Sequence, residues 1–172
     1  MAIPHFLICS RSFSDDKDTR HLSIFEIVDK LVLSELPSPE AGSVLFIGEQ
    51  RFVVVSAWMI DIKNGETYED EFEFKTTFKM ENGSILRMHL QTFKFTVNMP
   101  LHRMMINMIG SLPLKQSGIL LVECTVKKIG SQNSKTQTYR MFVEYQKSGE
   151  TDESTDKTEI TSADRKKKPK KF

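Results

Sequence analysis

The amino-acid sequence predicts an all-β protein: an antiparallel β-sandwich, immunoglobulin-like or similar, of about eight strands. Three observations predict it. Apolar and polar residues alternate at every second position over several stretches, which is the period of a strand with one buried face. Asn-Gly pairs, which favour tight turns, fall between such stretches. Strand patterns do not alternate with helical ones, so two packed sheets are favoured over a parallel sheet covered by helices.

The segment 23–33 is the first that requires a choice between strand and helix. Ser23 and Glu26 match a helix capping box. Apolar residues also follow at helical spacing: Ile24, Ile27, Val28 and Leu31. Residues 101–109, rich in Met and Ile, pose the same choice. We prefer a strand in both segments because strand patterns surround them.

The middle of the chain carries the strongest strand signals. Arg51–Ile62 is apolar at both parities, so we expect a central strand. The next stretch places Phe72, Phe74 and Phe78 on one face. Asn64-Gly65 lies between these stretches and predicts a hairpin turn.

A second hairpin is predicted at Asn82-Gly83. A three-residue loop, 81–83, pairs Phe78 with Leu86 and keeps apolar residues on one face, whereas a two-residue loop pairs Phe78 with Arg87. We prefer the three-residue loop, which also places the glycine at a left-handed position.

The later strands follow from the same period. Apolar residues change parity near Gln91-Thr92, so we expect a bulge or a sheet crossing there. Alternation over 120–126 and 139–145 predicts the last two strands. The polar stretch Ser131–Thr138 between them is expected to be an exposed hairpin loop.

The charge distribution divides the 172 residues into a domain and a tail. Residues 1–149 hold 17 basic and 17 acidic residues. Six acids against one lysine follow over 150–164, and the sequence RKKKPKKF ends the chain. So few apolar residues cannot offset the entropy of ordering. We therefore expect a β-sandwich domain over 3–147 and a disordered, acidic-then-basic tail over 148–172.

Several features indicate a cytoplasmic protein. The apolar runs are far shorter than the roughly 20 residues of a membrane helix. The N-terminal residues lack the basic region and the long apolar core of a signal peptide. The two cysteines, Cys9 and Cys124, are too few for a disulfide framework, and we expect both to be buried thiols.

No motif indicates catalysis, a metal or a cofactor. Four histidines stand at none of the spacings typical of metal ligands: His5, His21, His89 and His102. Acidic residues gather at 15–18 and at 66–73, where cation binding is conceivable but solvated turns and strand faces are the simpler interpretation. A Met-rich region is interpreted as core filling, with an adaptable partner-binding face as the alternative: Met99, Met104, Met105 and Met108.

The basic end of the tail is the sharpest local signal for a ligand. Six cations form a possible polyanion-binding site: Arg165, Lys166, Lys167, Lys168, Lys170 and Lys171. The same charges also suit an anionic membrane surface or a nuclear address, and a solubilising tail is the simplest interpretation.

Two stretches resemble an uncharacterised bacterial family of small β-sandwich proteins. His5–Ser10, the acidic loop that follows and His21–Lys30 resemble the family's opening, a hydrophobic strand, a Cys, an acidic loop and an LSIxGIFD pattern. Leu112–Glu123 resembles its xFPxxGxYxFEV strand. Glu26 stands where the family has Gly, and Ile119 where it has an aromatic residue. The resemblance implies a β-sandwich over about 3–146 and carries no catalytic residue across.

These observations favour a non-catalytic binding or scaffolding module that acts on a protein partner through a sheet face, an edge or loops, without a cofactor. The first alternative is a nucleic-acid-associated protein tethered by its basic tail. The second is an enzyme with a dispersed site.

Overall fold

The computed structural model describes residues 1–16, 21–33, 52–108, 112–114 and 117–145. Within them the chain forms nine strands and one short 3-10 helix, η1 (Ile62–Asn64). The strands are β1 (Ile3–Asp15), β2 (Leu22–Ile27), β3 (Lys30–Leu33), β4 (Phe52–Met59), β5 (Glu71–Met80), β6 (Ile85–Lys94), β7 (Leu101–Met108), β8 (Gly118–Lys128) and β9 (Ser134–Tyr145). No helix within the described residues is long and apolar enough to cross a membrane.

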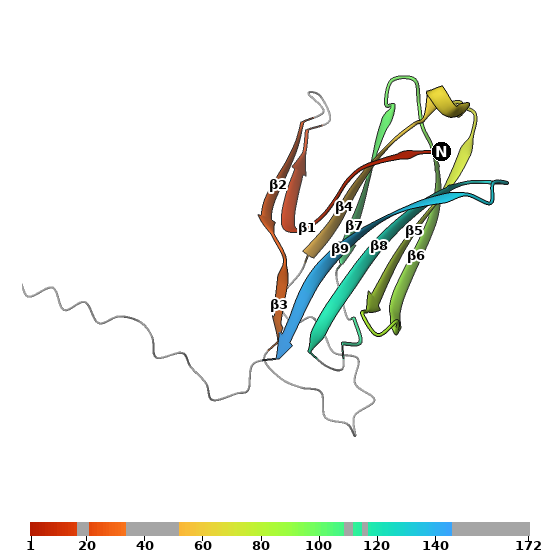
Figure 1. The fold of residues 1–172 in the computed structure, drawn as a ribbon. Coiled ribbons are helices and arrows are strands. Elements are labelled where there is room, and N and C mark those ends of the chain that lie inside the picture. The colour runs from red at the N-terminus through yellow and green to blue at the C-terminus, as the bar shows by residue number, and fades with distance from the viewer. Residues whose placement is uncertain (17–20, 34–51, 109–111, 115–116, 146–172) are drawn as a thin grey trace, which may run out of the picture.

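The strands form two sheets, which confirms the predicted all-β sandwich (Figure 1). Sheet A has the order β2-β1-β4-β7, and sheet B has the order β3-β9-β8-β5-β6. All neighbours are antiparallel except β3 and β9, which run parallel. The chain leaves sheet A after β2 and enters sheet B as β3, where the Tyr139 hydroxyl donates to the Val28 carbonyl at 3.0 Å.

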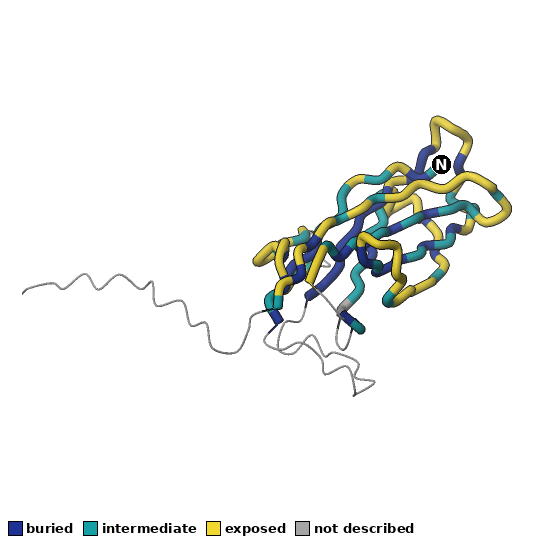
Figure 2. Tube along the Cα trace, turned by 60° about the horizontal axis from the view of Figure 1, so that its bottom comes forward, coloured by how far each residue is buried: buried dark blue, intermediate teal, exposed yellow. Residues whose placement is uncertain are grey.

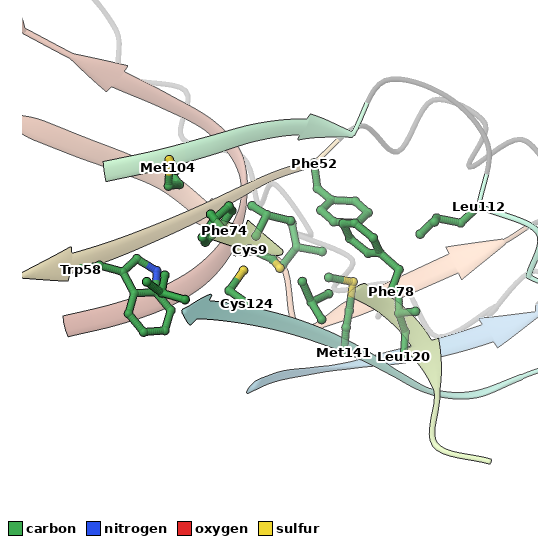
Figure 3. Close-up of a cluster of buried hydrophobic side chains, with 14 of the residues drawn as sticks. Cys9, Phe52, Trp58, Phe74, Phe78, Met104, Leu112, Leu120, Cys124 and Met141 are labelled. Carbon is green, nitrogen blue, oxygen red and sulfur yellow. The ribbon is translucent and has the colours of Figure 1, made fainter. Parts of the chain in front are cut away.

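The core lies between the two sheets (Figure 3). Sheet A contributes Phe52 and Trp58, and sheet B contributes Phe74, Phe78 and other fully buried side chains. In Figure 2 the buried positions run along the strands through the middle of the molecule, and the exposed ones lie at the turns and along the outer strands. Burial of these aromatic rings supplies the largest apolar areas in the core.

The predicted central strand is confirmed as β4, in which every residue from Phe52 to Trp58 is buried. Its inward side chains belong to the core. Its outward side chains, Val53, Val55 and Ala57, are equally buried, so other residues cover the outer face of sheet A.

The cover is the hairpin of β1 and β2. Residues 3–10 of β1 pair with β4, and residues 10–15 pair with β2. A straight β1 would carry Asp15 about 30 Å beyond Phe6. Instead the Asp15 carboxylate lies 2.8 Å from the guanidinium of Arg103, and β4 Ala57 lies between Phe6 and Arg103 in the sheet. The end of β1 therefore folds back over sheet A with β2, and we call this hairpin the arm (Figure 1).

The predicted hairpin at Asn64-Gly65 is wrong. These residues end the 3-10 helix, where Gly65 has a φ of +85°. The connection links β4 in sheet A to β5 in sheet B. Each of these strands already has two neighbours, so neither is available to pair with the other.

The hairpin at Asn82-Gly83 and its three-residue loop are confirmed: the Met80 N–H donates to the Ser84 carbonyl at 2.9 Å, Lys79 pairs with Ile85, and Gly83 has a φ of +89°. The predicted pairing of Phe78 with Leu86 is wrong. Phe78 pairs with Arg87, and the irregularity lies between Phe78 and Lys79 rather than near Gln91-Thr92. The reason lies at the other end of the hairpin, where Phe72 is paired with Phe93 in a cluster of buried rings. That cluster turns odd-numbered residues of β6 inward.

The other strand predictions stand. Both ambiguous segments are strands, β2 with β3 and β7. Most of Ser131–Thr138 is exposed as predicted, although β9 already begins at Ser134. Asp18 and the predicted tail, with its six candidate cations, lie outside the described residues.

Candidate functional site

The arm and sheet A enclose a cleft, which we call the hairpin cleft. It consists of two neighbouring hollows of about 420 Å³ and about 540 Å³ that share Leu101 and Arg103 of β7. The first also contacts Asp15 and Asp16 at the end of the arm. The second contacts the beginning of β2 and the beginning of β1.

The Asp15–Arg103 ion pair spans the cleft between the arm and β7. The carboxylate and guanidinium are 2.8 Å apart, and the side chains are 28% and 24% exposed. An ion pair with this much solvent contact contributes about 1 kcal/mol or less to the free energy of unfolding. Its main effect is to fix the end of the arm relative to sheet A.

The wall on the β7 side is mostly apolar. Leu101 and Met105 line it on the outward face of β7, and Met99 precedes the strand with 45% of its surface exposed. Met104 points the other way into the core, where the Gln91 amide donates to its sulfur at 3.3 Å. Alternation along β7 sends neighbouring methionines to opposite faces of the sheet. Met104 therefore fills the core, whereas Met105 lines the cleft.

His102 stands at the rim of the first hollow, with its ring stacked on Phe93 at 4.5 Å. Burial lowers the pKa of His102 below its usual value because the charged form loses water. The imidazole is therefore neutral near pH 7 and contributes an aromatic surface with a hydrogen-bonding edge.

The backbone of β7 adds a second kind of binding group. Within the described ranges, sheet A ends at β7. An edge strand presents unpaired N–H and C=O groups to an added strand. β7 pairs with β4 in regular register over Leu101–Met108, with no bulge and only one Arg or Lys. The devices that usually protect an edge are therefore sparse here.

The acidic residues near 66–73 do not form a cation site among the described residues. The Glu66 carboxylate is buried, accepts from the Asp61 backbone N–H at 2.7 Å and lies 2.8 Å from the Met1 ammonium. The Asp70 carboxylate lies 2.7 Å from the Lys128 ammonium, which holds the pKa of Asp70 below its usual value. In the part of the chain that the structure describes, no three His, Cys, Asp or Glu side chains gather as metal ligands do.

The two cysteines are buried and free, as expected. Burial raises the pKa of the Cys9 thiol far above its usual value and that of Cys124 to about 11. The Cys124 sulfur lies 3.5 Å from the Thr76 hydroxyl oxygen. Thiols in such surroundings are poor nucleophiles.

Sequence reasoning placed most of these residues correctly along the strands but missed the cleft. His5 and His21 contact its second hollow and His102 its first, whereas His89 lies exposed on β6. The assembly depends on β1 folding back over sheet A. No local pattern in the sequence reports such a long-range fold.

Comparison of the chain with models of protein families, with curated proteins and with solved structures found no match.

Proposed function

We propose that the chain is a non-catalytic binding module that captures an extended segment of a partner protein along β7. The segment adds a strand to sheet A, and its alternate side chains enter the hairpin cleft. The observation that carries this proposal is a regular strand at the edge of sheet A, within the described residues, directly beside an apolar hollow.

Strand addition explains why both features are useful together. Backbone hydrogen bonds to an edge supply affinity for any extended peptide, and pockets beside the edge select its side chains. Met99 and Met105 are flexible, polarisable side chains that adapt to apolar groups of different shape. The partner segment is therefore expected to carry an apolar residue at every second position. The two free thiols fit a cytoplasmic location for the protein and its partner.

Selection of random extended peptides on the full chain tests the proposal. Enriched peptides should lose at least tenfold in affinity when either Met99→Asp or Met105→Asp is introduced, because a carboxylate then lies in the apolar hollow. Ile62→Asp is the matched control, since Ile62 is an exposed apolar residue on the 3-10 helix. The Ile62→Asp variant should bind the enriched peptides with the same affinity as the unchanged chain.

N-methylation of the selected peptide separates strand addition from simple pocket binding. Methylating alternate peptide amides should abolish binding with a period of two residues, because only every second N–H of an added strand faces β7. A peptide that tolerates every N-methyl group, or that binds the Met99→Asp variant unchanged, would refute the proposal.

A further inference from the structure

The two cysteines face the same part of the core from opposite sheets. Cys9 lies on β1 in sheet A and Cys124 on β8 in sheet B, and both side chains are fully buried. Figure 3 shows the two side chains turned toward one another between the sheets. The chain has no other cysteine, so only one internal pairing exists.

The register of sheet A places Cys9 beside Ser56. Cys9 is paired with Val54 on β4, and Ser56 lies between Val54 and Trp58 on the inward face of that strand. Diagonal neighbours of this kind on one face of a sheet lie about 7–8 Å apart. Cys9 and Ser56 therefore present their short side chains to the same part of sheet B.

Cys124 reaches this place from the facing sheet. It is paired with Thr76 on β5, and the Thr76 hydroxyl oxygen lies 3.5 Å from the Cys124 sulfur. Burial raises the pKa of Cys124, and hydrogen bonds with Thr76 and Ser56 partly oppose that rise. The hydrogen bond with Ser56 crosses from one sheet to the other. Since each of these two side chains has one heavy atom beyond Cβ, the backbones of the sheets lie close together here.

The sheets also meet through β9, the neighbour of β8. Gln137 is paired with Cys124. Its side-chain amide donates to the Phe6 carbonyl at 3.0 Å and accepts from the Phe6 N–H at 3.1 Å, in the orientation that satisfies both groups. A side chain of sheet B thus holds the backbone of β1 shortly before Cys9. Burial raises the pKa of the Cys9 thiol, and the nearby Cys124 raises it further.

The small residues around the two thiols suit a covalent bridge. A disulfide joins residues whose Cα atoms are about 4.4–6.8 Å apart, whereas packed sheets are usually about 10 Å apart. Sheets approach more closely only where the side chains between them are small. Ser56 and Thr76, the polar neighbours of the pair, are small and fully buried.

We propose that Cys9 and Cys124 are a redox pair that closes into a disulfide between the two sheets, with a low-molecular-weight disulfide as the oxidant. One cysteine displaces a small thiol from the oxidant and forms a mixed disulfide. The other cysteine then attacks the protein sulfur of that mixed disulfide and releases the second small thiol. The two protein thiols together lose two electrons and two protons, which leave on the two small thiols.

The closed sandwich protects the reduced pair, because a buried thiol with a raised pKa reacts slowly. Exchange therefore takes place while the chain folds or when the sandwich opens. The bond then joins residues more than a hundred positions apart and restricts the unfolded chain. It gives the domain a stability that depends on the redox state. The pair belongs to the core, so the inference is independent of the proposed function.

Refolding of the full chain in a glutathione buffer tests the pair. The reduced chain is unfolded in urea and diluted into about 1 mM each of oxidised and reduced glutathione, so both thiols are accessible until the sandwich closes. Mass spectrometry after acid quenching should show mainly a monomer lighter by two hydrogen atoms, with the Cys9 and Cys124 peptides linked. The same buffer with concentrated urea should give at least tenfold less of this product, because the unfolded chain does not hold the two thiols together.

The single variants Cys9→Ala and Cys124→Ala are the matched controls. Each should give no internal disulfide and only a glutathione adduct at the remaining cysteine. Urea unfolding of the unchanged chain provides a second measurement that needs no variant. The midpoint of the oxidised chain should lie about 1 M or more above that of the reduced chain, and a reducing agent should abolish the difference.

Several results would overturn the proposal. A refolded chain could keep two free thiols, or carry only glutathione adducts or intermolecular disulfides. An internal disulfide could form equally well in concentrated urea, or lower the urea midpoint because the core must distort to make the bond. If the chain does not refold from urea, the folded chain is incubated in the same buffer with urea just below its unfolding transition, and the same products are expected.

Discussion

Glu26 in β2 has a backbone φ of +54°, in the left-handed region that disfavours residues with a Cβ atom. Its side chain is exposed, so no buried contact offsets the cost. Left-handed backbone costs a residue with a Cβ atom about 1–2 kcal/mol, which glycine does not incur. A glycine would therefore suit this backbone better than Glu26 does.

We expect Glu26→Gly to raise the free energy of unfolding by about 1 kcal/mol, after the greater freedom of glycine in the unfolded chain is subtracted. Urea unfolding measures the change. Glu26→Ala is the control, because it removes the same side chain but keeps the Cβ atom and should have little effect. Equal effects of the two substitutions would show that the backbone conformation is not the cause.

His102 makes the free energy of unfolding depend on pH. Its pKa is lowered in the folded state by burial, so the unfolded chain binds the proton more tightly. The stability from the neutral ring is present above the unfolded pKa of about 6.5 and is lost as the pH falls through the folded value. One proton limits the slope to about 1.4 kcal/mol per pH unit.

Replacing His102 by Gln should therefore flatten the decline in unfolding free energy between pH 7 and pH 5. Urea unfolding at the two pH values gives the comparison, with His89→Gln on the exposed side of β6 as the control. An unchanged difference between pH 7 and pH 5 in the His102 variant would contradict the assignment.

At the scale of the elements, the arm is a part of the fold with little support from other strands. Its strands pair only with each other beyond Ser10, and the Asp15–Arg103 ion pair fixes its end. Segments with few buried contacts open more readily than the core.

Asp15→Ala should increase the hydrogen-exchange rate of β2 amides at least fivefold while lowering the global free energy of unfolding by less than about 1 kcal/mol. Hydrogen exchange with mass spectrometry measures both regions. Glu123→Ala removes an ion pair of similar exposure within sheet B and should leave β2 unchanged. Faster exchange in β8 as well as β2 after the Asp15 substitution would argue against an independently opening arm.

The elements also show how far the sequence can be interpreted. The faces of β5, β8 and β9 were predictable because each packs on the core with one side only, so alternation reports burial directly. The register of β6 was not, because Met88 and Leu90 lie on the outer face of an edge strand, where apolar residues no longer mark the core. The parallel pairing of β3 with β9 joins residues more than a hundred positions apart and has no local signal.

The candidate site was less predictable than the fold for a related reason. Met105 and Arg103 could be assigned to one strand from the sequence, but only the folded-back arm brings Asp15 and His21 to them. A site assembled by a bend within one strand leaves no spacing motif.

At the scale of the whole molecule, the basic sequence at 165–171 predicts a weak, salt-dependent attraction to polyanions that is separate from the sandwich. If all six cations contact phosphates, log Kobs should fall against log salt with a slope of about −5. Residues 1–147 alone should lose this binding. Fluorescence anisotropy with a short DNA duplex at about 50 mM and about 200 mM salt measures it.

A full chain with glutamines at the six basic positions is the control, because it keeps the acidic half of the tail and the length. This variant should lose binding to the DNA duplex, as residues 1–147 alone do. Binding that persists without residues 148–172 would place the polyanion site elsewhere.

The position of β9 has a consequence for how the protein is made. β9 is the last described strand, yet it lies between β3 and β8 in sheet B. During synthesis, β3 emerges from the ribosome more than a hundred residues before β9, its neighbour in the described part of sheet B. Leu31 and Leu33 must therefore remain without their final packing until β9 has been translated, so two apolar side chains of the eventual core stay uncovered on the nascent chain for most of its synthesis.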